Sequence, residues 1–220
     1  MISERLKKVE PAPTLAIDAK TKQMIKEGVD IVGFGVGEPD FNTPENIKEA
    51  GIQAIRANRT RYTAAAGIPE LKTAVADKLR RENGLDYKPS EIVVSCGAKH
   101  TLFNIFMALL NPGDEVIIFS PYWVSYPEQV RIADGVPVFI PLDESRNFEI
   151  DFDRLERSIT RKTRAMIVNS PSNPTGAVLS EDSLMKLAET ALKHSLLIIS
   201  DEIYEKFIYN GKRHISIAAF

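Results

Sequence analysis

The sequence predicts an α/β protein with a mostly parallel sheet that helices cover on both faces. Two observations support this fold class. From residue 44 onward, segments with helical periodicity alternate with short apolar segments of strand length. Hydrophobic residues make up 44% of the 220 residues and charged residues 26%, which is the balance of a chain that can bury a sizeable core.

The first 43 residues are expected to form an N-terminal arm and a small-domain segment. Residues 14–27 have a helical pattern that Gly28 ends. An apolar segment at 31–36 then leads into a turn at 37–40.

Residues 44–220 are expected to form the large domain. Its first helix is predicted to start with Thr43 as the cap and Pro44 at the first helical position. The expected helices lie at 44–58, 69–83, 98–110, 123–133, 151–158 and 180–194. The expected strands lie at 92–94, 115–119, 136–140, 165–168 and 196–199.

Ligands of such sheets bind beyond the carboxyl ends of the strands, so the residues after each strand are the candidates for a site. Gly97, Ala98 and Lys99 follow the first expected strand and open an apolar helix. The free N–H groups and the dipole of a helix N-terminus favour a phosphate there. On its own, this pattern is more often an ordinary turn.

Three later strands also end in residues that could bind a ligand. Trp123, the only tryptophan, could stack on a planar ring or simply fill the core. Asn173 lies in turn-forming sequence and could offer its amide to a ligand oxygen. Asp201 and Tyr204 follow the last strand, where a solvated carboxylate is the ordinary explanation. The common location of these groups at one edge of one sheet favours a ligand site.

Composition argues against several other classes of function. The net charge of −2 comes from 28 basic and 30 acidic residues without a long run of one sign, so no nucleic-acid partner is expected. No apolar run is long enough to span a membrane, and a cytoplasmic location is expected. Cys96 is the single cysteine and is expected to be a small packing residue. The three histidines, at positions 100, 194 and 214, lack ligand-like spacing, so no metal site is expected.

The sequence resembles the class I aminotransferases of pyridoxal-phosphate fold type I, in particular the bacterial aspartate aminotransferases. The resemblance extends over essentially the whole chain and runs through these segments in order: Gly-Glu-Pro-Asp-Phe at 37–41, Arg-Tyr-Thr at 61–63, Ala-Gly-Ile-Pro-Glu-Leu at 66–71, Gly-Ala-Lys at 97–99, Pro-Tyr-Trp at 121–123, Asn-Pro-Thr-Gly at 173–176 and Ser-Asp-Glu-Ile-Tyr at 200–204. Each segment is short, but their order and spacing are specific.

The resemblance implies a role around the cofactor ring for several residues. Asp201 would pair with the pyridine nitrogen and keep it protonated, so that the ring can accept electrons when a substrate Cα–H bond breaks. Tyr204 and Asn173 would hydrogen-bond the phenolic oxygen of the ring. Trp123 would stack on the ring face.

The resemblance also implies roles at the phosphate, the substrate and the dimer interface. Backbone N–H groups of Gly97, Ala98 and Lys99 would hold the phosphate, and the Lys99 ammonium could bind the distal carboxylate of a dicarboxylic substrate. The backbone of Gly37 would approach the α-carboxylate, which a residue without a side chain permits. Tyr62 would reach the cofactor phosphate of the neighbouring subunit, which implies a homodimer with shared active sites.

The sequence departs from the family pattern at one essential point. In the family, the lysine that forms the Schiff base with the cofactor lies some tens of residues beyond the Asp-Glu-Ile-Tyr segment, whereas this chain ends at Phe220. Lys206 and Lys212 follow that segment too closely to replace it. We therefore expect this chain to be the N-terminal part of the enzyme, with an incomplete large domain, and to be inactive alone.

Alternative functions remain open from the sequence. A lyase of the same fold, or a transaminase for aromatic or prephenate-like substrates, shares most of these motifs. A non-catalytic regulator with an aminotransferase-like domain is another class, but no basic DNA-binding module precedes Gly37. The glycines at 33–37 resemble a dinucleotide-binding loop, but Glu38 and Pro39 break that pattern.

Overall fold

The computed structural model describes residues 2–10, 13–32, 37 and 41–220, and the chain forms two compact units. The sheet unit comprises Met1–Glu10 and Pro69–Phe220, and the N-terminal unit comprises Pro11–Ile68. These boundaries differ from the one that we placed between residues 43 and 44. The boundaries of the two units separate residues that pack compactly together. The boundary expected from the sequence instead marks where helical and strand patterns begin to alternate.

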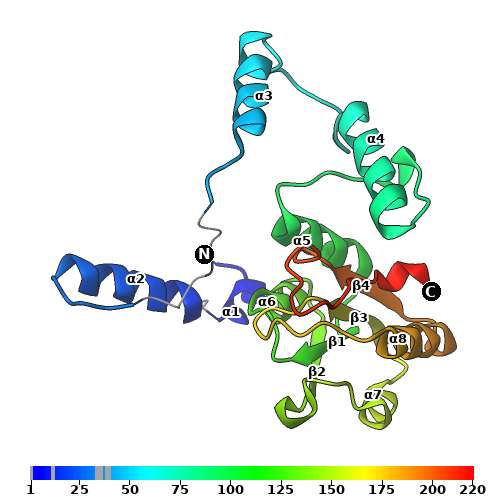
Figure 1. The fold of residues 1–220 in the computed structure, drawn as a ribbon. Coiled ribbons are helices and arrows are strands. Elements are labelled where there is room, and N and C mark those ends of the chain that lie inside the picture. The colour runs from blue at the N-terminus through cyan, green and yellow to red at the C-terminus, as the bar shows by residue number, and fades with distance from the viewer. Residues whose placement is uncertain (1, 11–12, 33–36, 38–40) are drawn as a thin grey trace. The chain divides into compact units, whose positions relative to one another are not determined.

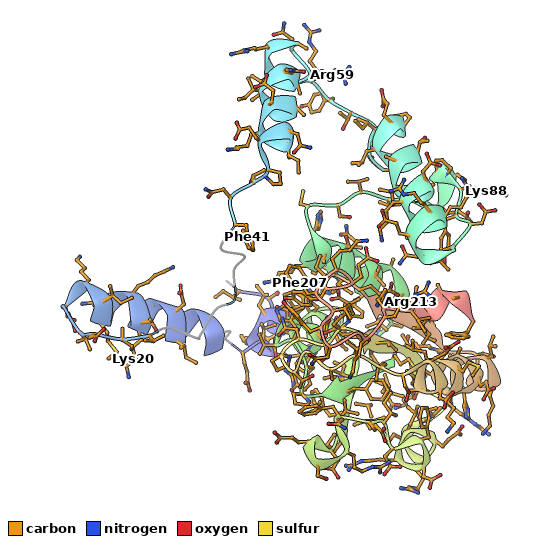
Figure 2. All side chains as sticks on the ribbon, viewed as in Figure 1. Lys20, Phe41, Arg59, Lys88, Phe207 and Arg213 are labelled. Atoms are coloured by element: carbon orange, nitrogen blue, oxygen red, sulfur yellow. The ribbon has the colours of Figure 1, made fainter. Side chains whose placement is uncertain are left out.

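The N-terminal unit contains two of the expected helices, α2 (Pro13–Lys26) and α3 (Glu45–Arg56). The cap predicted for the second helix is wrong. Pro44 is itself the N-cap of α3, with an extended ψ of 143°, and no side chain caps this helix. No residue of α3 is buried, and its side chains radiate from the ribbon in Figure 2. Most of the apolar segment and turn expected at 31–40 lies outside the described residues.

The sheet unit contains a fully parallel, four-stranded sheet in the order β2-β1-β3-β4 (Figure 1). Its strands are β1 (Glu115–Ser120), β2 (Val136–Pro141), β3 (Thr163–Asn169) and β4 (Leu197–Asp201). Four expected strands are thus confirmed, within two residues at each end. The order places the carboxyl ends of β1, β3 and β4 side by side.

The strand predicted at 92–94 is wrong. Ile92 has the backbone of a strand, with φ −110° and ψ 130°, but residues 92–94 pair with none of the described strands. β-branched residues favour an extended backbone locally, whereas a strand also requires a partner edge that local sequence does not reveal. Val93 is accordingly 66% exposed.

The helices of the sheet unit largely agree with the periodicity of the sequence. The confirmed α-helices are α4 (Pro69–Lys78), α5 (Ala98–Leu109), α6 (Ser125–Ile132), α7 (Phe152–Ser158) and α8 (Glu181–His194). A π-helical segment, η1 (Leu79–Asn83), continues α4, and the short helix α1 (Glu4–Lys7) was not expected. Three 3₁₀ turns complete the unit: η2 (Pro89–Glu91), η3 (Glu144–Arg146) and η4 (Ile217–Ala219).

Helices cover both faces of the sheet, as predicted (Figure 1). Successive side chains of β1 point to opposite faces. Ile117 packs in one core cluster with Leu187 of α8, whereas Ile118 packs in the other with Phe106 of α5 and Val130 of α6. This packing holds the N-terminal ends of α5 and α6 near the carboxyl edge of the sheet. Across the described parts of the chain, the helices are all too short or too polar to cross a bilayer.

Candidate functional site

A pocket of about 360 Å³ opens at the carboxyl edge of the sheet. It is lined by Gly97, Ala98, Lys99, Trp123, Tyr126, Asn169, Asn173, Asp201, Ile203 and Tyr204. These residues come from the start of α5, the start of α6 and the ends of β3 and β4. The pocket therefore lies where ligands bind in open parallel sheets.

Asp201, the last residue of β4, presents a carboxylate that hydrogen bonds hold at both oxygens. The Tyr126 hydroxyl donates to Oδ2 at 2.7 Å, and the Ile203 N–H donates to Oδ1 at 3.2 Å. Asn169 lies opposite Asp201 in the β3–β4 pairing, and its Nδ2 donates to the Asp201 carbonyl oxygen at 2.8 Å. Both the backbone and the side chain of Asp201 are thus fixed from neighbouring elements.

Asn173 and Tyr204 meet at the same pocket. Asn169 Oδ1 accepts a hydrogen bond from the Asn173 N–H at 2.7 Å, which fixes the loop after β3. Asn173 Nδ2 lies 3.4 Å from the Tyr204 hydroxyl. The Asn173 amide and the Tyr204 hydroxyl therefore form a pair that can bind one ligand oxygen between them.

Trp123 provides an aromatic surface beside these polar groups. Its ring makes an edge-to-face contact with Tyr126, with 5.4 Å between the ring centroids. The Lys99 ammonium lies 5.1 Å from the centroid of the indole, within the range of a cation–π interaction. Lys99, Trp123 and Asp201 thus line one pocket that offers a cation, an aromatic surface and a carboxylate.

The start of α5 forms the anion-binding end of the pocket. Gly97 precedes the helix with a φ of 84°, a conformation that glycine adopts without a steric penalty. The Gly97 N–H already donates to the Ser95 carbonyl at 2.8 Å, so the geometry favours Ala98 and Lys99 as donors. These two residues open α5, where no preceding carbonyl of the helix accepts their N–H groups.

The structure gathers most of the expected site residues but not all of them. Gly97, Ala98, Lys99, Trp123, Asn173, Asp201 and Tyr204 line the pocket. Gly37 and Tyr62 belong to the N-terminal unit, whose position relative to the pocket is not determined. Both residues are exposed, and no other described residue of its unit covers Tyr62 from solvent.

Tyr126, Asn169 and Ile203 also line the pocket, and they were not predicted from the sequence. Tyr126 follows Trp123 by three residues, a spacing that places both on one side of a helical turn, so a signal existed. Asn169 ends its strand as Asp201 does, but only their pairing in the sheet reveals the contact. Ile203 contributes its backbone N–H, and the type of residue at this position gives no signal of that role.

Cys96 and His214 differ from expectation. Cys96 is exposed rather than packed. His214 comes together with Glu202 and Glu205 in a group that could hold a metal ion. All four carboxylate oxygens, however, already have partners: Ser200, Ser216 and His214 for Glu202, and Lys78 and Asn83 for Glu205. Hydrogen bonds within the protein thus bind both carboxylates, while His214 Nδ1 is buried without a hydrogen-bond partner among the described residues.

The fold and the pocket together define a class of protein: an α/β protein with a pocket at the carboxyl edge of a parallel sheet. The chain belongs to the class I and II aminotransferase family, whose model matches residues 29–220. Class I aminotransferases such as aspartate aminotransferase use pyridoxal 5′-phosphate.

Similar proteins include enzymes named for aspartate and for prephenate. The chain is 52% identical to the aspartate aminotransferase of Bacillus sp. (strain YM-2) over 99% of its length and 56% of the relative's. It is 51% identical to a probable aspartate/prephenate aminotransferase of Aquifex aeolicus, again over 56% of that protein. The structure of Thermus thermophilus aspartate aminotransferase with maleate superposes with a TM-score of 0.95 at 48% identity, over 99% of this chain and 56% of that one. The chain thus spans just over half the length of these relatives.

Proposed function

We propose that this chain belongs to a pyridoxal-phosphate-dependent aminotransferase that moves an amino group between an amino acid and a 2-oxo acid. Aspartate or a similar dicarboxylate is the proposed amino donor. The observation that carries the proposal is the pocket itself, which combines an anion-binding helix start, an aromatic face and an ordered carboxylate. Because the chain covers only part of its relatives, the proposal concerns the complete protein. By this we mean the chain continued to the length of the relatives.

The residues at the pocket fit pyridoxal phosphate from end to end. The N–H groups of Ala98 and Lys99 and the dipole of α5 suit a phosphate. Trp123 offers a surface for an aromatic ring. Asp201 offers a carboxylate whose two oxygens are already oriented, which suits a protonated ring nitrogen.

Each of these residues contributes to the chemistry by position and charge. When bound, pyridoxal phosphate supplies an electron-accepting ring that stabilises the charge left at Cα after proton loss. Asp201 accepts a hydrogen bond from the ring nitrogen and keeps the proton there. Tyr204 and Asn173, 3.4 Å apart at their polar atoms, bind the phenolic oxygen of the ring. Trp123 excludes water from one ring face.

Three further residues are proposed to act at the substrate and at the subunit interface. Lys99 extends its ammonium over Trp123 and is placed to attract the distal carboxylate of aspartate. Gly37 is proposed to contact the α-carboxylate through its backbone. Tyr62, whose side chain is fully exposed, is proposed to reach the cofactor phosphate of a second subunit in a homodimer. Sedimentation of the complete protein at twice the chain mass is the expected result, and a monomer would contradict the shared site.

The remaining features of the enzyme are proposed for the part beyond this chain. The relatives extend well past the matched region, and the lysine that forms the Schiff base is proposed to lie there. The chain alone is therefore proposed to be inactive, with 1–43 as arm and small-domain segment and 44–220 as part of the large domain. A cytoplasmic location is proposed for the complete protein.

Replacement of Lys99 by methionine in the complete protein tests the proposed function. Lys99→Met keeps a long side chain over Trp123 but removes the charge. Loss of one charge-assisted contact predicts a decrease of roughly 10- to 100-fold in kcat/KM for aspartate. Phenylalanine, which lacks the distal carboxylate, is expected to change less than about threefold.

The matched control is Lys193→Met on α8, which removes an exposed lysine paired with Glu156 away from the pocket. Equal losses for aspartate and phenylalanine would assign Lys99 to the phosphate instead of the substrate. Absence of amino transfer by the unmodified protein would refute the proposed function. Comparing 2-oxoglutarate with prephenate as amino acceptor then decides between the two activities for which the relatives are named.

A further inference from the structure

Tyr126 is a buried residue in the pocket whose hydroxyl bonds only one group among the described residues. Its side chain is 2% exposed, and the hydroxyl donates to Asp201 Oδ2 at 2.7 Å. α6 holds the ring in place, because the Tyr126 N–H bonds the Trp123 carbonyl at 3.0 Å and the ring packs against the indole. The hydroxyl thus approaches the carboxylate from a fixed direction.

The hydroxyl acts as a donor over the whole working pH range. Burial, and then the neighbouring Asp201 carboxylate, raise the pKa of Tyr126 far above its usual value. The phenol therefore keeps its proton. Asp201 Oδ2 is the acceptor in this pair.

Without this donor, the carboxylate has one fixed oxygen instead of two. The Ile203 N–H holds Oδ1 at 3.2 Å, and rotation about the terminal torsion of an aspartate is otherwise soft. With both oxygens bonded, the plane of the carboxylate is set at the pocket that Asp201 lines. A ring nitrogen in the pocket then meets an acceptor that needs no reorganisation.

We propose that Tyr126 is a positioning residue that orients the Asp201 carboxylate toward the ring nitrogen of the cofactor. This role rests on the proposed function and adds a residue to it. Tyr126 itself does not touch the reacting atoms. Its effect passes through Asp201, so it depends on the presence of a ring nitrogen in the ligand.

The test compares two probes that differ only at that ring atom. Pyridoxamine 5′-phosphate cannot condense with surface lysines, and its 1-deaza analogue carries a C–H in place of the ring nitrogen. Binding of each probe to the complete protein is measured by isothermal titration calorimetry. Tyr126→Phe keeps the ring and its packing and removes the hydroxyl alone.

Tyr126→Phe is expected to weaken binding of pyridoxamine phosphate about tenfold, the usual effect of one hydrogen bond to a charged group. Binding of the deaza analogue is expected to stay within about twofold, because no ring nitrogen meets Asp201. Tyr122→Phe is the matched control. Tyr122 stacks on Phe139, and its hydroxyl bonds no group among the described residues, so neither probe should be affected.

A double-mutant cycle with Asp201→Ala tests whether the effect of Tyr126→Phe on binding acts through Asp201. In the Asp201→Ala background, Tyr126→Phe is expected to cause no further loss. Circular dichroism establishes that each variant is folded. If the unmodified complete protein binds pyridoxamine phosphate but Tyr126→Phe weakens both probes equally, or neither, the positioning role is refuted and the proposed function stands. If the unmodified complete protein binds neither probe, the proposed function fails and the positioning role fails with it.

Discussion

Pairs of charged and polar side chains hold the turn that carries Tyr204. Lys206 Nζ donates to Glu82 Oε2 at 2.6 Å, and Arg81 also bonds the Glu82 carboxylate. These bonds, Lys206 first, lower the pKa of Glu82 to about 2. Glu205, in the same turn, bonds Lys78 and Asn83. Burial raises the pKa of Glu205, but these two hydrogen bonds together with the charges of Lys78 and Lys206 outweigh it, and the net direction is downward.

The lowered pKa of Glu82 predicts a pH-dependent contribution to stability. Because this pKa lies lower in the folded chain than its ordinary value of 4.5, the stabilisation is complete above about pH 4.5 and is lost as the pH falls through about 2. Glu82→Gln should therefore lower the thermal midpoint near pH 7, as measured by circular dichroism. The difference between the two proteins should vanish on acidification to about pH 2. A difference that stays constant over this range would contradict the assignment.

At the scale of elements, the connection from α6 to β2 depends on the absence of a side chain at Gly135. A Cβ there would lie 2.8 Å from Leu110 Cδ1, 3.0 Å from Val130 Cγ1 and 3.2 Å from the Asp114 carbonyl oxygen. The Gly135 N–H also bonds the Val130 carbonyl at 2.9 Å, which ends α6 and starts the turn into β2. This close approach holds α6 against the sheet.

Gly135→Ala is expected to lower the free energy of unfolding by roughly 1–3 kcal/mol, through overpacking against Val130 and the Asp114 backbone. Gly51→Ala is the control, because Gly51 lies inside α3 and a Cβ there meets nothing within 4 Å. Alanine in that exposed helix should be neutral or slightly stabilising. Urea denaturation measures both variants. Equal midpoints for Gly135→Ala and the unmodified chain would show that the turn can shift without cost.

The elements that the sequence predicted well are those whose pattern is local. Periodicity locates α5, α8 and the four paired strands, because each buries one face or a continuous apolar run. The strand expected at 92–94 could not be decided in this way, since pairing depends on a distant edge. The cap of α3 was misplaced by one residue, because Thr43 and Pro44 both suit a helix start.

At the candidate site, sequence motifs identified most of the residues that line the pocket but not the residues that hold them in place. Asp201 and Trp123 lie in segments that resemble a known family, whereas Asn169 and Tyr126 act through contacts that the parallel sheet creates. Asn169 reaches Asp201 only because β3 and β4 pair in this register. Long-range contacts of this kind need the fold, not the motif.

At the scale of the whole molecule, the chain belongs to the class I and II aminotransferase family, and amino transfer is the activity proposed for the complete protein. The chain spans 56% of the relative from Bacillus sp. (strain YM-2), and the sheet unit alone contains the entire pocket that carries the proposal. The N-terminal unit contains Gly37 and Tyr62, which the proposed function assigns to the substrate and to a second subunit. The pocket is therefore proposed to bind the pyridoxal phosphate that amino transfer requires.

The most direct test is the absorption spectrum of the complete protein after it is mixed with pyridoxal phosphate and dialysed. We predict a retained visible band that aspartate removes and 2-oxoglutarate restores, because each half of an amino transfer reverses the other. Failure to retain the cofactor, or a retained band that aspartate leaves unchanged, would refute the proposed function.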